Sequence, residues 1–447
     1  MSIMERTLII DSFQKLNEKV IIKGWVSAIR DHGKIKFVDI SDRSGILQTV
    51  LSSEKEVSMG DVLKVLGTIK KRPEKMVNTK IVTGTVELEI EKLEVLEKAG
   101  EFPFDMGDAD LKVSLEILLD YRPLTLKHPK TKAIFKVQET IVHSFRETLK
   151  SLGFTEIFVP TLVPCATEGG AEVFKVDYYD GKAYLAQSPQ LYKQIMVGVF
   201  ERVFTIAHAY RAEPSVTTRH MSEYVSLDCE MGFIESFSDI LDVVEIVVKG
   251  IFKSLNNTCL KELALYNAKT PLVSEKIPRI KMREAQEIIL KRTGRDNTKE
   301  PDLSPEDEKE ICQYSKEKYQ SELIFITHYP TKKRPFYTYP SDDDPEYTDS
   351  FDLLGRGLEW ITGGRRINNY NKLLDNIKKW GNKKEDFEIY LQAFKYGMPP
   401  EGGFAVGAER VTMQVLGLKN IREASLFPRD MQRVDIKISK EKKDGAK

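Results

Sequence analysis

The chain has 447 residues, and 68 Lys and Arg balance 68 Asp and Glu, so its formal net charge is zero. This length allows two or three domains, and neutrality means that any affinity for nucleic acid must come from local patches of charge. The four cysteines are far apart with no CxxC pair, which argues against a zinc site or a disulfide framework. With no run of about 18 apolar residues and no signal-peptide core, we expect a soluble cytoplasmic protein without a membrane partner.

Residues 1–98 have the pattern of a small β-barrel. Short strands separated by turns predict a five-stranded barrel of the OB type, whose open face accommodates single-stranded nucleic acid. On that face Phe37 is placed to stack on a base and Gln48 to contact a base edge, while Arg30 and Lys36 meet phosphate. A plain core role for Phe37 stays open. The expected strands span residues 19–26, 34–40, 46–50, 62–69 and 85–95.

Residues 99–125, with Pro103 and Gly107, are interpreted as a linker or hinge, and residues 126–447 as the second domain. A helix is expected at 129–152, because its apolar residues recur at spacings of three and four. Gly153 ends it in the C′ position, and a strand follows at 155–159.

The segment 165–200 contains two candidate ligand-binding features. Glu168 lies in a glycine-containing loop that is either a lid over a cationic group or an ordinary solvated loop. A helix starts after it, with Ser188 as N-cap and Pro189 in the first turn. Its apolar stripe leaves Lys193 with Gln190 and Gln194 on another face, so Lys193 is a candidate binder of a carboxylate.

Residues 201–233 predict two buried antiparallel strands joined by a long polar loop. Arg211, Glu213, Asp228 and Glu230 fall within or beside these apolar strands, where an unpaired charge is costly. They form either a structural ladder of salt bridges or a site for a charged ligand. The loop favours the ligand, because its Arg219 and His220 can reach a polyanion.

Residues 236–330 are expected to be a helical insertion without chemistry, and strands follow at 323–327, 334–339, 348–354 and 357–366. Asp352 and Glu359 suit a divalent cation that bridges phosphates. With Arg366 they suit a structural triad equally well. A last helix begins near Ala408, and Arg410 in its first turn opposes the helix dipole, which suggests an anionic or aromatic partner such as a nucleotide. The basic tail at 435–447 is expected to touch RNA phosphates at most.

Three segments resemble the signature motifs of the class II aminoacyl-tRNA synthetases. They are GFTEIFVP at 153–160, YRAE with RHMSEY at 210–224, and GAER at 407–410. Together with the barrel and the segments QSPQLYKQ and RPFYT, they resemble subclass IIb, most closely the aspartyl-tRNA synthetases of archaeal and eukaryotic type. The resemblance implies an α+β fold, with an OB-type barrel before a catalytic domain whose antiparallel sheet is flanked by helices.

The resemblance implies a nucleotide site. Arg211 and Arg410 are the expected catalytic residues: Arg211 would hold the ATP α-phosphate, and Arg410 would stack on adenine opposite Tyr224. Asp352 and Glu359 match the family's metal-binding acids, so Mg²⁺ is the expected cofactor. The implied ATP-binding residues are Arg211, Glu213, Arg219, His220, Tyr224, Glu359 and Arg410.

The resemblance also implies an amino-acid site and a tRNA site. Lys193 and Arg366 would bind the side-chain carboxylate of L-aspartate, and asparaginyl enzymes of similar build lack this lysine. Phe37 and Gln48 would read the anticodon. The implied amino-acid-binding residues are Glu168, Ser188, Gln190, Lys193, Asp228 and Arg366.

The implied function is the ATP-dependent ligation of L-aspartate to tRNA(Asp) through an aspartyl-adenylate, by a homodimer. Arg365, Asn368 and Glu401 depart from the family's usual residues near the pocket: the first adds a positive charge, and the other two replace imidazoles. Three alternatives stay open. They are a non-discriminating enzyme that also charges tRNA(Asn), an asparaginyl enzyme, and a paralogue that binds RNA without charging it.

Overall fold

The computed structural model describes residues 5–33, 35–52, 56–79, 81–166, 172–214 and 217–435. The chain divides into two compact units, residues 1–112 and residues 113–447. The N-terminal unit is a closed barrel with the strand order β1-β2-β3-β5-β4, as the sequence predicts. Its strands are β1 (Lys19–Asp31), β2 (Ile35–Ser41), β3 (Ile46–Ser52), β4 (Val62–Lys71) and β5 (Val86–Glu97).

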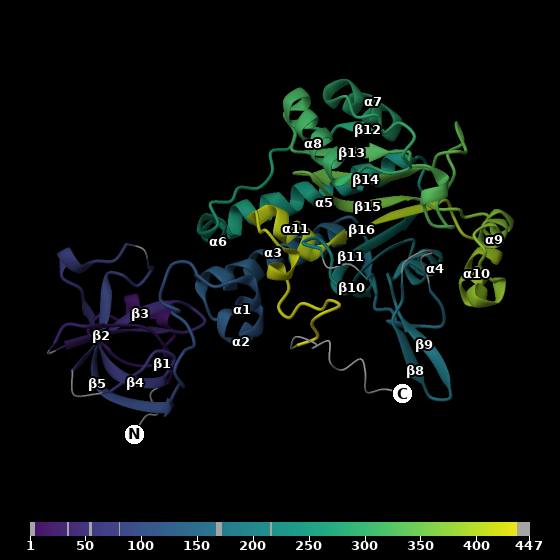
Figure 1. Ribbon diagram of the computed structural model, residues 1–447. Coiled ribbons are helices and arrows are strands. Elements are labelled where there is room, and N and C mark those ends of the chain that lie inside the picture. The colour runs from purple at the N-terminus through teal and green to yellow at the C-terminus, as the bar shows by residue number, and fades with distance from the viewer. Residues whose placement is uncertain are drawn as a thin grey trace. The chain divides into compact units, whose positions relative to one another are not determined.

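The C-terminal unit is built on an eight-stranded sheet within the described residues (Figure 1). The sheet is antiparallel except at its two edges, where β6 pairs with β10 and β12 with β13 in parallel. The expected antiparallel sheet is therefore mixed, because long crossover connections rather than hairpins join these short edge strands to β10 and β13. In spatial order the strands are β12 (Arg279–Lys281), β13 (Leu323–Thr327), β14 (Ser350–Gly355), β15 (Leu358–Arg365), β16 (Glu401–Gly407), β11 (Glu223–Gly232), β10 (Arg202–Tyr210) and β6 (Thr155–Glu156).

Helices α3 (Pro129–Ser151), α5 (Phe237–Thr258) and α11 (Ala408–Leu416) share one apolar core with the sheet. Strand periodicity explains which side chains enter this core: Leu227, Cys229 and Met231 of β11 belong to it. Successive residues of a strand point to opposite faces, so Asp228 and Glu230 lie on the other face of the sheet. The alternation thus separates the charges of β11 from the helical layer.

Other elements surround the sheet. Helix α4 (Gln190–Phe200) packs on β10 and β11. Helices α9 (Tyr370–Lys379) and α10 (Glu388–Lys395) lie together beyond one end of the sheet, and α7 (Met282–Thr293) and α8 (Pro305–Tyr319) lie beside the β12–β13 edge (Figure 1). The smaller elements are α1 (Leu115–Asp120), α2 (Arg122–Thr125), α6 (Leu260–Leu265), β7 (Leu162–Val163), β8 (Lys175–Tyr178) and β9 (Gly181–Leu185).

Two segments differ from the sequence-based expectation. Residues 236–330 are more than a helical insertion, because α5 forms part of the main core and β12 and β13 extend the sheet. The expected strand at 334–339 is absent from the described residues. A turn at Phe336–Tyr337 follows Pro335 there, and proline cannot donate to a strand ladder.

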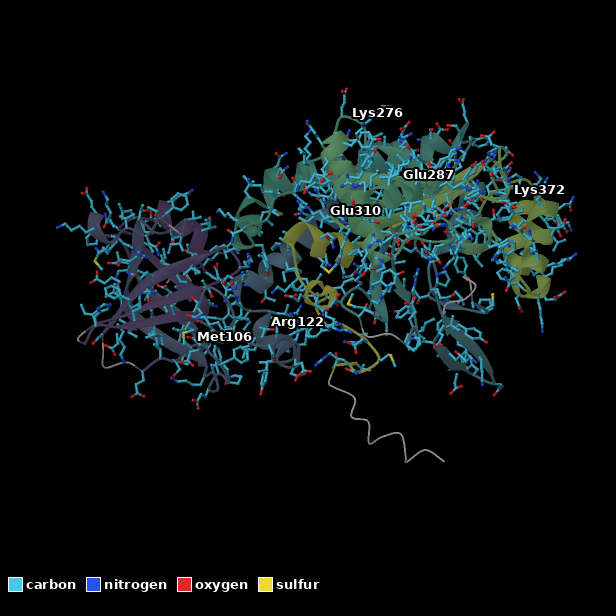
Figure 2. All side chains as sticks on the ribbon, turned by 45° about the horizontal axis from the view of Figure 1, so that its top comes forward. Met106, Arg122, Lys276, Glu287, Glu310 and Lys372 are labelled. Carbon is cyan, nitrogen blue, oxygen red and sulfur yellow. The ribbon has the colours of Figure 1, made fainter. Side chains whose placement is uncertain are left out.

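The expected linker ends earlier than residue 125. Arg122 (Figure 2) is buried in the C-terminal unit, where its guanidinium donates to the carbonyls of Leu426 at 2.8 Å and Glu423 at 2.9 Å. Burial lowers the pKa of Arg122 to about 10. These contacts fix α2 to the end of the C-terminal unit.

Among the described residues, no helix is both long and apolar enough to cross a membrane.

Gly403 of β16 allows the close approach of β11, so we predict that Gly403→Ala destabilises the C-terminal unit. A Cβ atom at this position would collide with the Cys229 carbonyl and the Glu230 carboxylate. Overpacking of this kind costs about 1–3 kcal/mol. Calorimetric unfolding of the full chain measures the change.

Gly198→Ala in α4 is the matched control, because its Cβ would meet only Met398, at 3.5 Å. Alanine in a helix is favoured over glycine by about 1 kcal/mol, so this variant should be neutral or stabilised. An unfolding free energy of Gly403→Ala equal to that of the wild type would contradict the prediction.

Candidate active site

Four charged side chains form a closed cluster on the face of the sheet opposite the main core. The Lys193 ammonium of α4 lies 2.9 Å from Asp228 Oδ1 and 3.1 Å from Glu230 Oε2. Arg366, directly after β15, donates from Nε to Glu230 Oε1 at 2.7 Å. The side chains of Lys193 and Asp228 are each only 1% exposed. The cluster contains equal numbers of positive and negative groups and is closed to water.

The electrostatics keep the two cations of the cluster charged. Burial opposes the charge of Lys193, but Asp228 and Glu230 outweigh it and raise the pKa of the lysine. Burial also opposes the charge of Arg366, but the negative charge of Glu230 outweighs this effect and raises the pKa of the arginine. The two cations named as carboxylate binders are therefore together, and Glu230 lies between them.

A second layer of polar groups supports this cluster. Gln194 donates to Glu401 Oε1 at 2.8 Å and accepts at 3.0 Å from both Gln190 and the Tyr390 hydroxyl. Glu230 was predicted to belong to the buried charges of these strands but was not among the implied amino-acid-binding residues, and Tyr390 was not predicted at all. The sequence does contain an indication for Glu230: it lies two residues from Asp228, and residues two apart in a strand point to the same face of the sheet.

The remaining residues of the predicted amino-acid site fall in three places. Ser188 precedes α4, which begins at Gln190, two residues after the expected N-cap, and the Ser188 hydroxyl accepts from the Gln190 amide at 3.3 Å. Gln190 is buried beside Gln194. Glu168 lies outside the described residues.

The predicted nucleotide-binding residues gather beside the loop between β10 and β11. The Arg211 guanidinium lies 3.9 Å from Glu213 and 5.6 Å from the ring of Tyr224. Arg410 lies 3.2 Å from Glu359, and this contact supplies the anionic partner that its position in α11 suggested. Both arginines are thus beside carboxylates, and their side chains are 37% and 23% exposed, which leaves them open to a ligand.

Arg219 and His220 lie in the same electrostatic neighbourhood. Burial lowers the pKa of His220, and the charges of Arg410, Arg211 and Arg219 lower it further. Arg219 forms an ion pair with Glu308 of α8 at 3.3 Å. Sequence analysis missed Glu308, because an acid in the first turn of a helix is common on its own account. Burial and the charge of Glu359 raise the pKa of Glu308 to about 7.

The two predicted metal ligands lie close enough to influence each other. Burial raises the pKa of Glu359, and the charge of Asp352 contributes. Asp352 Oδ2 accepts from Arg334 at 2.9 Å, and its buried Oδ1 has no hydrogen-bond partner in the described part of the chain. The triad with Arg366 is therefore wrong, since Arg366 pairs with Glu230 instead.

The described residues contain no group of three or more His, Cys, Asp or Glu that could hold a metal by itself. Two carboxylates, one with an unpartnered oxygen, instead fit a cation that takes its other ligands from phosphate oxygens and water.

The three departures from the family pattern are accounted for locally. Arg365 lies over the ring of Tyr339 at 3.8 Å and 3.4 Å from Asp342, so its charge has its own partners. Asn368 donates to the Met398 carbonyl at 3.2 Å. Glu401 alone enters the buried cluster, through Gln194.

On the barrel, Phe37 and Gln48 lie on neighbouring strands but differ in accessibility. Phe37 is half-buried and packs edge-on against His32 at 5.4 Å. Gln48 is 7% exposed, accepts from Arg30 at 3.1 Å and donates to Glu87 at 2.8 Å. Contact of Gln48 with a base therefore requires an exchange of these partners.

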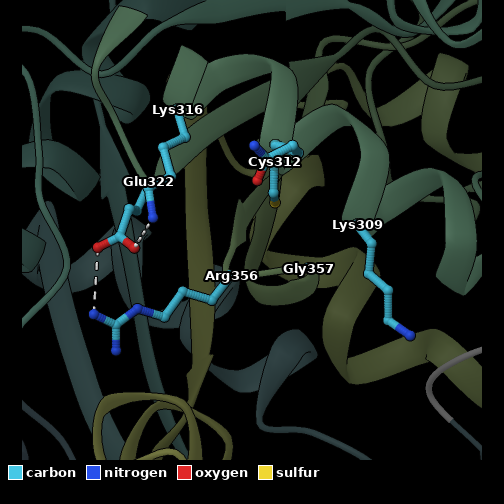
Figure 3. A pocket seen from close by; sticks show the side chains of 7 residues that line it. Lys309, Cys312, Lys316, Glu322, Arg356 and Gly357 are labelled. Carbon is cyan, nitrogen blue, oxygen red and sulfur yellow. Dashed lines mark hydrogen bonds and ion pairs between the residues drawn. The ribbon is translucent and has the colours of Figure 1, made fainter. Parts of the chain in front are cut away.

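One surface pocket of about 250 Å³ lies between α8 and the turn before β15 (Figure 3). Lys316 and Arg356 in this pocket both pair with Glu322, at 3.4 Å and 3.3 Å. None of the predicted site residues lines it.

Curated relatives cover nearly the whole chain. It is 42% identical over 430 residues, 96% of this chain and 99% of the relative, to the "Aspartate--tRNA(Asp/Asn) ligase" of Thermus thermophilus. It is 38% identical over 434 residues, 94% of this chain and 97% of the relative, to the "Aspartate--tRNA(Asp) ligase" of Pyrococcus abyssi.

A similar solved structure is the asparaginyl-tRNA synthetase of Pyrococcus horikoshii complexed with asparaginyl-adenylate, with a TM-score of 0.86 and 32% identity. The match covers 97% of this chain and 100% of that one. Family matches agree with this: residues 20–96 match the OB-fold nucleic acid binding domain, and residues 114–431 match the class II tRNA synthetases (D, K and N). The chain belongs to the class II tRNA synthetases of the D, K and N type.

Proposed function

We propose that this protein ligates L-aspartate to tRNA(Asp) with ATP, through an aspartyl-adenylate. The observation that carries the proposal is the pair of buried cations, Lys193 and Arg366, on one face of the sheet that also bears the nucleotide-binding arginines. The names of relatives at 38–42% identity, all aspartate-tRNA ligases, support it.

The first step joins two anions. The α-carboxylate of aspartate attacks the α-phosphorus of ATP, its oxygen forms the new P–O bond, and pyrophosphate leaves. Arg211 compensates negative charge on the α-phosphate, and Arg410 holds the adenine. The residues act by positioning and by fixed charge, so no protein nucleophile is needed.

The second step transfers the aspartyl group. A hydroxyl of the terminal adenosine of tRNA loses its proton and attacks the carbonyl carbon of the adenylate. The bond between this carbon and the phosphate oxygen breaks, and AMP leaves. Anticodon recognition by the barrel, with Phe37 as a stacking platform, selects the tRNA.

Magnesium is part of the proposal. Asp352 and Glu359 would hold it, and the unpartnered Asp352 Oδ1 supports this assignment. When bound there, the ion would supply positive charge to the phosphate oxygens. Arg334 and Arg410 keep the two carboxylates in place through contacts at 2.9 Å and 3.2 Å.

Selection against asparagine would follow from the two cations. The β-carboxylate of aspartate can accept hydrogen bonds from both Lys193 and Arg366, whereas the amide of asparagine offers one acceptor oxygen and an NH₂ group that cannot accept from either cation. Sites that reject a substrate by leaving a buried polar group unpaired discriminate by about 10⁴ to 10⁵. The asparaginyl alternative is therefore disfavoured.

A second function is favoured by the comparisons. The relatives at 41–42% identity carry names that include both tRNA(Asp) and tRNA(Asn). We therefore also propose aspartylation of tRNA(Asn), which an aminoacylation assay with each purified tRNA tests.

The decisive experiment for an enzymatic role is amino-acid-dependent exchange of pyrophosphate into ATP, with aspartate and asparagine separately. We expect exchange with aspartate. Exchange with asparagine alone indicates an asparaginyl enzyme, and no exchange with either indicates an RNA-binding paralogue.

A homodimer is proposed from exposed apolar side chains that follow β6 and β11. Phe158, two residues after β6, is 88% exposed, and Phe233, directly after β11, is 68% exposed. Val199 and Phe200 at the end of α4 lie near Phe233, because the Gly232 amide donates to the Glu201 carbonyl at 2.8 Å. The resemblance of residues 153–160, which contain Phe158, to the first signature motif of the class II synthetases supports a second copy as the occupant.

A cytoplasmic location is supported by the four cysteines, all free thiols, as in reducing compartments.

Lys193→Met should abolish aspartate-dependent exchange while ATP binding is retained. It also leaves Asp228 and Glu230 buried without their lysine, which costs about 3–5 kcal/mol of stability. The double variant with Glu230→Gln relieves this cost but should remain inactive with aspartate. Recovery of aspartate activation in the double variant would show that Lys193 has only a structural role.

Phe37→Ala should raise the KM for tRNA without slowing aspartate-dependent exchange, since loss of a stacked base costs about 1–3 kcal/mol. Aminoacylation kinetics measure the first quantity. Trp25→Ala is the control, because Trp25 is an exposed aromatic on the same barrel. Slowed adenylate formation would refute a separate reading role.

Phe158→Asp should convert a dimer into monomers, because it places a charge in the proposed apolar interface. Light scattering after size-exclusion chromatography gives the mass. Tyr179→Asp is the control: Tyr179 is 91% exposed beyond the end of β8, and its substitution should leave the dimer intact. A wild type that is monomeric at all concentrations would end this part of the proposal.

A further inference from the structure

Glu401 has a buried oxygen that no contact accounts for. It is the first residue of β16 and is 0% exposed. Its Oε1 accepts from Gln194 at 2.8 Å, whereas its Oε2 has no hydrogen-bond partner among the residues that the structure describes. A buried polar atom without a partner is costly, so this oxygen needs either a proton or a ligand.

The polar and charged groups around Glu401 come from several elements. Gln194 of α4 is held in one orientation, because its carbonyl oxygen accepts from Gln190 and from Tyr390 of α10. Its NH₂ group therefore points to Glu401. The other charged and titratable neighbours are Lys193 of α4, Glu230 of β11, Arg366 after β15, and Tyr337 and Tyr390.

Charge counting shows why this position matters. Lys193 and Arg366 already balance Asp228 and Glu230. An ionised Glu401 adds a third negative charge to a dry cluster. The β-carboxylate of aspartate adds a negative charge at the same two cations, whereas the amide of asparagine adds none.

We propose that Glu401 is a specificity-determining residue whose ionisation and the binding of the aspartate side chain exclude each other. This inference rests on the proposed function. With Glu401 neutral, the cluster carries no net negative charge that opposes a carboxylate. With Glu401 ionised, the cluster is net negative and disfavours the carboxylate of aspartate but not the amide of asparagine.

The protonation equilibrium gives the sign of the pH effect. Burial, together with the charge of Glu230, raises the pKa of Glu401 well above its ordinary value. The neutral form therefore predominates at low pH, and rising pH ionises the group. Aspartate binding weakens as pH rises, and asparagine binding does not.

The test measures, with the full chain, the KM for aspartate in pyrophosphate exchange between about pH 6 and 8.5, and the inhibition constant of asparagine over the same range. Because aspartate binding requires one proton on Glu401, the ratio of the KM for aspartate to the inhibition constant of asparagine should rise by up to about tenfold per pH unit. Glu401→Gln mimics the neutral form of the carboxyl group. In this variant the ratio of the KM for aspartate to the inhibition constant of asparagine should therefore be independent of pH.

Glu245→Gln is the control. Glu245 is a buried glutamate of α5 that accepts from Lys249 at 2.6 Å and from the Ile277 amide at 3.2 Å. Its variant should keep the wild-type pH profile.

A wild-type ratio that does not change with pH, or parallel profiles for the wild type and Glu401→Gln, overturns the proposal. If Glu401→Gln does not fold, the wild type is titrated calorimetrically with aspartate and with asparagine at the upper end of the pH range. Repeating the titration in buffers of different ionisation enthalpy gives the number of protons taken up on binding. Proton uptake with aspartate and none with asparagine is expected, and equal uptake overturns the inference. No aspartate-dependent exchange at any pH refutes the proposed function itself, whereas exchange with a pH-independent KM refutes only the role of Glu401.

Discussion

The contact of Lys193 and Arg366 with the one carboxylate of Glu230 joins three elements of the C-terminal unit on one face of its sheet. The two cations come from α4 and from the end of β15, and Glu230 comes from β11. Replacing such buried ion pairs by apolar side chains is often neutral or stabilising, by about 1–4 kcal/mol. Stability alone therefore gives little reason for charges at this position, whereas the proposed binding of a ligand carboxylate would explain them.

The sheet makes this arrangement possible because strand periodicity divides β11 between two environments. Leu227, Cys229 and Met231 pack into the main core, and Asp228 and Glu230 face α4. Gly403 on the neighbouring strand pairs with Glu230 and leaves room for its carboxylate. The same backbone register thus fixes the core and the charged cluster.

The sequence was most informative where a pattern repeats or a motif is long. The barrel strands, α3 and the β10–β11 hairpin follow from periodicity, and the three motifs identify the family. Partners across the fold were harder to predict. Arg366 was interpreted together with Asp352 and Glu359 because of spacing along the chain, but the sheet brings it to Glu230. Glu308 and Tyr390 come from helices whose local sequence gives no sign of the site, since only tertiary packing brings them there.

Whether these charges bind a ligand carboxylate can be seen in a crystal structure of the protein with a non-hydrolysable analogue of aspartyl-adenylate. We expect the β-carboxylate of the analogue to lie within hydrogen-bond distance of both Lys193 Nζ and the Arg366 guanidinium, with the adenine beside Arg410. A complex in which the β-carboxylate contacts neither cation, while both remain paired with Glu230 alone, would contradict it.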